Sequence, residues 1–88
     1  MMDRKIVLND GTEIMDGTAG LSSSGKLWIY FTGYTMMQAA MMFLDPEKTE
    51  RIVFFGGENE TTYEGYTSCV NMSKDENGQF HICMTREE

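Results

Sequence analysis

The residue types that could support metal binding or redox chemistry are few in this chain of 88 residues. It has one histidine, His81, and two cysteines, Cys69 and Cys83. His81 precedes Cys83 by two residues, so both would lie on one face of a strand, and Cys69 could complete a trio of zinc ligands. Structural zinc sites usually contain closely spaced cysteine pairs, which this sequence lacks. We therefore predict two free thiols and no bound metal or cofactor.

The relative position of the two cysteines depends on the last predicted hairpin. Its turn is Asp75-Glu76-Asn77-Gly78, a sequence typical of tight connections between strands. If Ser73 pairs with Gln79, Cys69 lies directly opposite Cys83, about 4.5–5.5 Å away at Cβ. A relaxed disulfide prefers a shorter separation. A change of one residue in the turn would remove this pairing.

No group of residues predicts enzymatic activity. The sequence has no cysteine–histidine or serine motif of the kind found in hydrolases, and His81 has no evident orienting partner. The segment 17–25 is rich in glycine and serine, but it lacks the following lysine–serine or lysine–threonine pair of a phosphate-binding loop. The carboxylates gather in predicted turns. We therefore predict that the protein is not an enzyme.

The charge balance narrows the range of partners. The formal net charge is −7, from 14 acidic and 7 basic residues. Nucleic-acid backbones and anionic membranes attract basic surfaces, so direct binding to either is disfavoured. The acidity is compatible with solubility, a basic protein partner or mimicry of nucleic acid.

Two further features of the sequence bear on its location. The longest apolar run, residues 39–44, is far shorter than the roughly 20 residues of a membrane-spanning helix. The chain also opens without a signal-peptide pattern. We therefore expect a cytoplasmic location and no membrane association.

The strands that would carry these residues are short. Asp10-Gly11 between residues 5–8 and 12–15 predicts a β-hairpin. The strongest strand, residues 26–31, places Leu27, Ile29 and Phe31 on one face and Trp28 and Tyr30 on the other. We interpret residues 17–25 as a connecting loop. Further strands are predicted over residues 51–55, 61–63, 66–73 and 79–85.

One helix interrupts this succession of strands. Thr35 is a suitable N-cap for a helix over residues 36–44, and Asp45-Pro46 ends it. Residues 1–88 are therefore predicted to form a single α+β domain, with one short helix packed on a mainly antiparallel, meandering sheet. With this many short strands, the sheet could curl into a partial barrel or split into a sandwich.

The helix is apolar on nearly every side, and Gln38 is its only polar residue. A surface helix normally has one apolar and one charged face. One helix is not easily covered on both sides by so short a chain, and methionine suits adaptable contact surfaces. We therefore predict self-association or partner binding through four residues of this helix: Met36, Met37, Met41 and Leu44.

Turn and core residues along most of the chain resemble those of a known group of proteins. They include the hairpin over residues 6–14, the segment Phe43-Leu44-Asp45-Pro46-Glu47-Lys48-Thr49, the segment Tyr63-Glu64-Gly65-Tyr66-Thr67 and the final turn at Asn77-Gly78. The sequence resembles small proteins encoded by phages and prophages of Firmicutes. The resemblance contains no chemical motif, so it implies an origin and a fold and no site residues.

The resemblance implies a phage accessory protein that acts by binding. The interpretation that we prefer is a stoichiometric inhibitor of a host defence system, which would block a protein channel or sequester a signalling nucleotide. A nucleotide would need cations and stacking aromatic residues. Trp28, Tyr30 and Tyr34 are the candidates for stacking. The alternative is a small virion component of the neck or baseplate region. Both interpretations allow a homo-oligomer.

Overall fold

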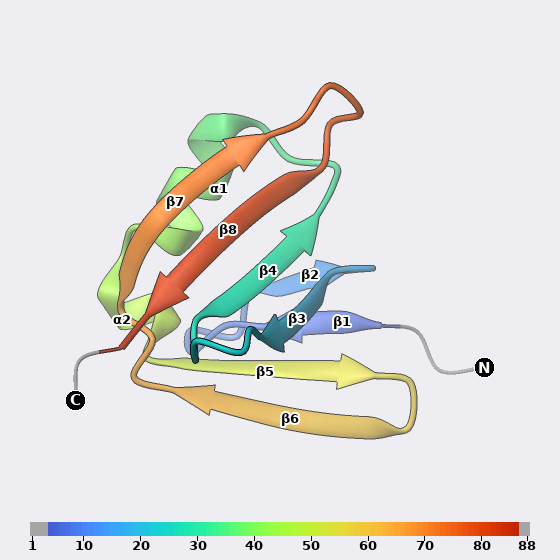
Figure 1. Ribbon diagram of the computed structural model, residues 1–88. Helices are drawn as coiled ribbons and strands as arrows, with labels where there is room; N and C mark the ends of the chain where they lie inside the picture. Colours follow the sequence, from blue (N-terminus) through green and yellow to red (C-terminus); the bar gives the residue numbers. More distant parts are fainter. Residues whose placement is uncertain (1–3, 87–88) are drawn as a thin grey trace.

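The computed structural model describes residues 4–86, which form an α+β fold with eight strands in two antiparallel sheets and two short helices (Figure 1). Sheet A has the order β2-β1-β5-β6, with β1 at Lys5–Val7, β2 at Glu13–Met15, β5 at Arg51–Gly56 and β6 at Asn59–Glu64. Sheet B has the order β3-β4-β8-β7, with β3 at Thr18–Leu21, β4 at Leu27–Phe31, β7 at Ser68–Lys74 and β8 at Phe80–Thr85. The predicted fold class is confirmed, and the sheet is split in two.

The predicted first hairpin is present as β1 and β2. Leu8 N–H donates to the carbonyl of Thr12, and Gly11 lies in the left-handed region at φ 89°. This is the conformation that glycine adopts in tight turns at least cost. The β1 strand pairs with β5 on its other side, with Ile6 opposite Phe54. The first hairpin is thereby joined to β5 and β6 in one sheet.

Strand β4 is central in sheet B, between β3 and β8. Leu27, Ile29 and Phe31 are buried, whereas Trp28 and Tyr30 are half-buried on the opposite face. The predicted division of this strand into two faces is confirmed. We call the face of sheet B that carries Trp28 and Tyr30 its outer face, because it points away from the core.

Strand β3 corrects the interpretation of residues 17–25 as a loop. Thr18–Leu21 pairs along β4, with Gly20 opposite Trp28. Ser22 N–H donates to the carbonyl of Lys26, and Gly25 has a φ of 82° in the turn between the strands. A weak strand former such as Thr-Ala-Gly-Leu becomes a strand here because its aromatic, β-branched neighbour β4 provides a ladder of hydrogen bonds.

Helix α1, at Met36–Phe43, begins at Thr35 as predicted. The hydroxyl of Thr35 accepts the N–H of Gln38, and the Gln38 side chain accepts the N–H of Thr35 in return. These bonds form a capping box, which satisfies two backbone donors at the helix start. The one-turn helix α2, at Pro46–Thr49, follows directly, with Asp45 as its cap.

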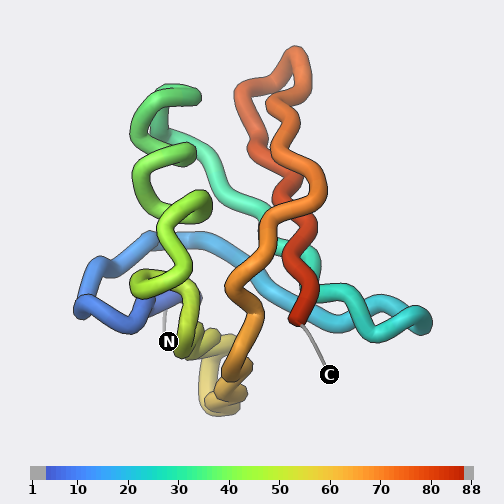
Figure 2. Tube along the Cα trace, turned by 90° about the vertical axis from the view of Figure 1, so that its left-hand side faces the viewer, coloured from blue at the N-terminus to red at the C-terminus, as the bar shows by residue number. Residues whose placement is uncertain are grey.

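The core lies between the inner face of sheet B and the two elements that cover it. Figures 1 and 2 show α1 along one part of this face, while β1 and β5 cross near the other end. Phe31 on β4 stacks on Phe43 of α1 and on Phe80 of β8, with centroid distances of 5.4 and 5.0 Å. Ile6 and Ile52 from sheet A belong to the same buried cluster. The helix and both sheets therefore share one core.

The final hairpin differs in register from the prediction. Ser73 pairs with His81 and Lys74 with Phe80, so residues 75–79 form a longer connection. A bulge between Cys69 and Asn71 then shifts the register again. Cys69 lies opposite Met84, and Cys83 lies opposite Asn71. The two cysteines are therefore not cross-strand partners.

The longer turn has a visible cause in Asp75. Its N–H donates to the carbonyl of Gln79, which closes the five-residue connection. One carboxylate oxygen, Oδ1, also accepts the N–H groups of Asn77 and Gln79. This side-chain-to-backbone bonding stabilises a turn that strand propensities do not predict.

Candidate functional site

The predicted contact residues of α1 are all exposed. Relative exposure is 75% for Met37, 63% for Met41, 59% for Leu44 and 45% for Met36. Met37, Met41 and Leu44 follow the i, i+4, i+7 spacing of one helix face. We call these four residues the α1 surface.

The opposite side of α1 contacts the core. Ala39, Met42 and Phe43 are buried, so the helix has one inward face and one outward face, both apolar. The sequence pattern predicted that so apolar a helix would not be covered on both sides by this short chain. The structure places it on one side of sheet B, with an apolar face outward.

The α1 surface itself carries no charge, although charged residues follow it in the chain. The ammonium group of Lys48 donates to the carbonyl of Met41 over 3.2 Å, close to the C-terminus of the helix. A cation is favoured there because it interacts with the unpaired carbonyls of the last turn. No residue of α1 carries a formal charge. The α1 surface is therefore an uncharged patch on a strongly acidic protein.

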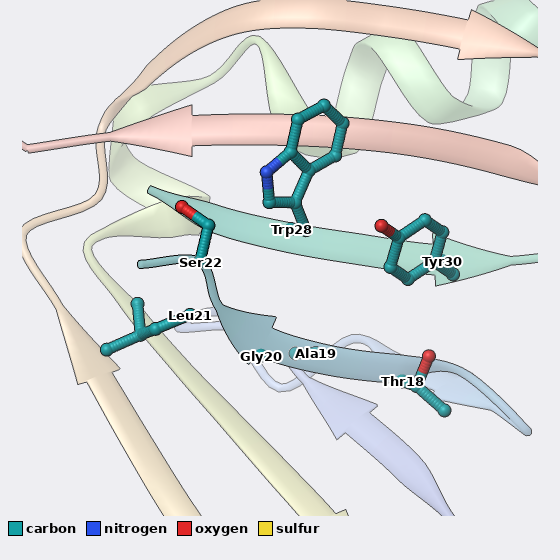
Figure 3. Close-up of a pocket in the computed structure, with 7 residues that line it drawn as sticks. All are labelled: Thr18, Ala19, Gly20, Leu21, Ser22, Trp28 and Tyr30. Carbon is teal, nitrogen blue, oxygen red and sulfur yellow. The ribbon is translucent and has the colours of Figure 1, made fainter. Parts of the chain in front are cut away.

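A second candidate surface lies on the outer face of sheet B. The rings of Trp28 and Tyr30 have centroids 6.3 Å apart and planes that differ by 12°. Figure 3 shows the two rings side by side along β4, with their broad sides turned to the viewer. We call this pair the aromatic platform.

The platform borders a hollow of about 450 Å³ over β3. Gly20 lies opposite Trp28, and a Cβ at Gly20 would have no atom within 4 Å. The absence of a side chain at this position therefore opens the space beside the indole. The hydroxyl groups of Thr18 and Ser22 lie along the edges of the hollow (Figure 3). Its lining combines apolar surface with neutral hydrogen-bonding groups.

His81 extends the aromatic platform onto β8. Its ring meets the ring of Tyr30 edge-on at a centroid distance of 5.1 Å. His81 Nε2 also lies 3.0 Å from Asp75 Oδ2. The expectation that His81 has no orienting partner is therefore wrong. Asp75 begins the five-residue turn, and this turn brings its side chain back to His81, the second residue of β8.

The hydrogen bonds of Asp75 also change its acidity. The bond from the His81 side chain, followed by the bond from the Gln79 N–H, lowers the pKa of the Asp75 carboxyl below its ordinary value of 3.8. Each bond favours the ionised form of the carboxylate. At neutral pH the side chain of Asp75 is therefore a stable acceptor for the histidine and the turn.

Tyr34 does not join Trp28 and Tyr30, contrary to the sequence-based grouping of the three. Its ring packs edge-on against Phe31, with a centroid distance of 5.4 Å. Phe31 belongs to the buried core and points away from the outer face of sheet B. Tyr34 precedes α1 and is held by core packing, so the stacking candidates reduce to Trp28 and Tyr30.

The two thiols are free and occupy different environments. Cys69 packs against the core, and burial raises the pKa of its thiol. Cys83 pairs with Trp28 on the outer face. His81 shares that face with Cys83, but Cys69 does not, so the conceivable zinc trio is not assembled. Within residues 4–86 no group of three or more histidine, cysteine or acidic side chains is arranged to hold a metal ion.

One cation lies near the platform. Lys26 precedes Trp28 by two residues, so alternation places it on the same face. Arg86 lies elsewhere, because its guanidinium is over the ring of Tyr66, a residue of the core cluster, at 5.2 Å. Lys26 and Arg86 both line a second hollow of about 280 Å³, but its lining includes Leu21, which pairs with the core-facing Leu27.

Comparison of the chain with protein-family models, curated proteins and solved structures gave no match. In the part of the chain that the structure describes, no helix has the length and apolar character needed to cross a membrane.

Proposed function

We propose that this protein acts by stoichiometric binding, without turnover, and that the α1 surface is its contact with a protein partner. The observation that carries the proposal is the exposure of Met37, Met41 and Leu44 on one face of a helix whose other face is already in the core. Contiguous exposed apolar residues mark interaction sites in soluble proteins. Methionine side chains adapt to the shape of a partner at small cost.

The charge distribution supports a particular kind of partner. The chain carries −7 overall, while the α1 surface is uncharged. A partner with an apolar groove surrounded by basic residues would match both features. A second copy of the chain would match the apolar surface, but two acidic proteins would repel each other.

The absence of turnover is supported by the chemistry of the described residues. His81 is oriented by Asp75, but its ring contacts an aromatic side chain, Tyr30, and no described contact links it to a hydroxyl or thiol. Raising the pKa of Cys69 makes its thiol a poorer nucleophile at neutral pH. A nucleophile, a base and an orienting group must be within reach of each other for covalent catalysis.

The resemblance to phage proteins supplies the biological setting of the proposal. A small acidic binding protein in the host cytoplasm would act as an inhibitor of a host defence protein. A virion assembly role remains the competing proposal, and it requires the α1 surface to contact further copies or other structural subunits.

Native mass spectrometry of the complex purified from expressing or infected cells tests this function. We expect a partner at a fixed, small whole-number ratio, with both components chemically unmodified. Inhibition of that partner should saturate at the same ratio. Modified partner or product formed in excess over the protein added would contradict binding without turnover.

A further inference from the structure

We propose that the outer face of sheet B is a nucleotide site, in which a planar base stacks on the aromatic platform and a phosphate group contacts Lys26. This inference goes beyond the proposed function, because it assigns a small-molecule site that does not involve α1. It rests on the lining of the hollow over β3, on the alternation of β4 and on the space above Gly20.

The stacking part of the site is formed by Trp28 and Tyr30. Their nearly parallel rings, 6.3 Å apart, lie side by side on a sheet face (Figure 3). Aromatic side chains on an open sheet face are a recurrent means of stacking nucleobases. The edge-on contact of His81 with Tyr30 holds one end of the platform in place.

The depth of the site comes from Gly20. It faces Trp28 across the β3–β4 pair, and nothing lies within 4 Å of where its Cβ would be. A base edge can therefore descend beside the indole toward the backbone of β3. The hydroxyls of Thr18 and Ser22 border this space and are neutral donors and acceptors for a polar heterocycle.

The anionic part of the ligand is assigned to Lys26. Alternation along β4 places Lys26 on the same face as Trp28, and the bond from Ser22 N–H to the Lys26 carbonyl continues the ladder to that position. Lys26 is exposed and, within residues 4–86, forms no ion pair. Its ammonium group is therefore free to contact a phosphate beside the platform.

The charge of the whole protein limits the ligand to a short one. Every additional phosphate would extend over a surface with a net charge of −7, and polyanions lose affinity on such a surface. A mononucleotide or similarly compact nucleotide satisfies the platform and the one cation beside it. A single-stranded nucleic acid does not.

Titration with adenosine 5′-monophosphate, adenosine and ribose 5-phosphate tests the assignment. Trp28 is the only tryptophan, so quenching of its fluorescence and a shift of its indole N–H resonance report on the platform alone. We expect saturable quenching by the nucleotide, with affinity about tenfold above that of adenosine because one charge-assisted contact contributes about that factor. Ribose 5-phosphate should bind more weakly than the nucleotide.

Two pairs of variants make the test specific. Gly20→Val adds a side chain that the strand accommodates and should abolish quenching while preserving the fold, whereas Thr62→Val on exposed β6 should bind normally. Lys26→Gln should reduce nucleotide affinity about tenfold toward that of adenosine. Arg51→Gln, which removes the same charge elsewhere, should leave it within about twofold of the wild-type value.

Three results would overturn the proposal. The first is no response of Trp28 to the nucleotide at millimolar concentration. The second is an affinity for adenosine equal to that for the nucleotide, which would exclude the phosphate contact, or an affinity for ribose 5-phosphate equal to it, which would exclude the stacking. The third is normal binding by Gly20→Val. None of these results would affect the α1 surface, so failure of this site is distinguishable from failure of the proposed function.

Discussion

Trp28 and Cys83 are directly opposed across the β4–β8 pair, and the cysteine is only 2% exposed although it lies on the outer face of its sheet. Figure 3 shows the indole of Trp28 reaching across β8, the strand that carries Cys83. The indole therefore shields the Cys83 thiol, which the core does not cover, and still has one exposed face.

Replacing Trp28 with alanine should expose the Cys83 thiol. We expect alkylation of Cys83 by iodoacetamide, measured by mass spectrometry of the peptides, to become several-fold faster in Trp28→Ala. Cys69 serves as the internal control, since its thiol packs against the core and its reaction rate should not change. Trp28→Phe should give an intermediate rate. Equal acceleration at both cysteines would show general unfolding and would contradict a local shield.

The capping box at the start of α1 predicts a measurable loss of stability. Thr35→Ala removes the hydroxyl that accepts the N–H of Gln38 and should lower the free energy of unfolding by about 1 kcal/mol. In a domain of this size the midpoint of thermal unfolding should fall by about 4–8 °C. Thr32→Ala is the matched control, because Thr32 is exposed and its side chain forms no hydrogen bond within residues 4–86. Equal midpoints for the two variants would refute the role of the cap.

The lowered pKa of Asp75 predicts how stability depends on pH. Because its hydrogen bonds with His81 and the turn depress the pKa in the folded state, the contribution of Asp75 is fully present above pH 3.8. It is lost as pH falls further, through the folded-state pKa. Asp75→Asn should therefore be less stable at neutral pH and should show a flatter decline below pH 3.8. Thermal unfolding between about pH 6 and pH 2 measures this, with Glu76→Gln as control. An unchanged acid profile in Asp75→Asn would contradict it.

Local patterns were sufficient to predict much of this fold. The Asp10-Gly11 turn, the cap at Thr35 and the two faces of residues 26–31 each depend on neighbouring residues, and each is confirmed. The exposure of Met37 and Met41 was also expected from the composition of the helix. In each case the deciding interactions are between residues that are close in the sequence.

The features that sequence reasoning missed depend on partners that are remote or on side chains that stabilise a turn. Strand β3 has weak intrinsic preference and forms because β4 pairs with it. The register of the last hairpin is set by the bonds of Asp75 and by a bulge near Val70. The longer turn moves the partner of Ser73 by two residues, from Gln79 to His81, and the bulge takes back one, so Cys69 lies opposite Met84 instead of Cys83. The pairing of Asp75 with His81 followed from the same turn and could not be foreseen without it.

The central claim, that the α1 surface binds a protein partner at a fixed ratio, is tested most directly by comparing three forms of the protein as baits. The wild type, Met37→Glu/Met41→Glu and Val70→Glu would be expressed in the same host cells, and the captured complexes weighed by native mass spectrometry. Val70 is 57% exposed outside α1, so it matches the chemical change without altering the α1 surface.

The circular dichroism of all three should agree, because substitutions at exposed positions change stability by about 0.5 kcal/mol or less. We predict one whole-number complex with a partner protein for the wild type and Val70→Glu, and its loss in the double variant. An identical complex with the double variant, or a wild type that stays monomeric and captures nothing, would contradict the account.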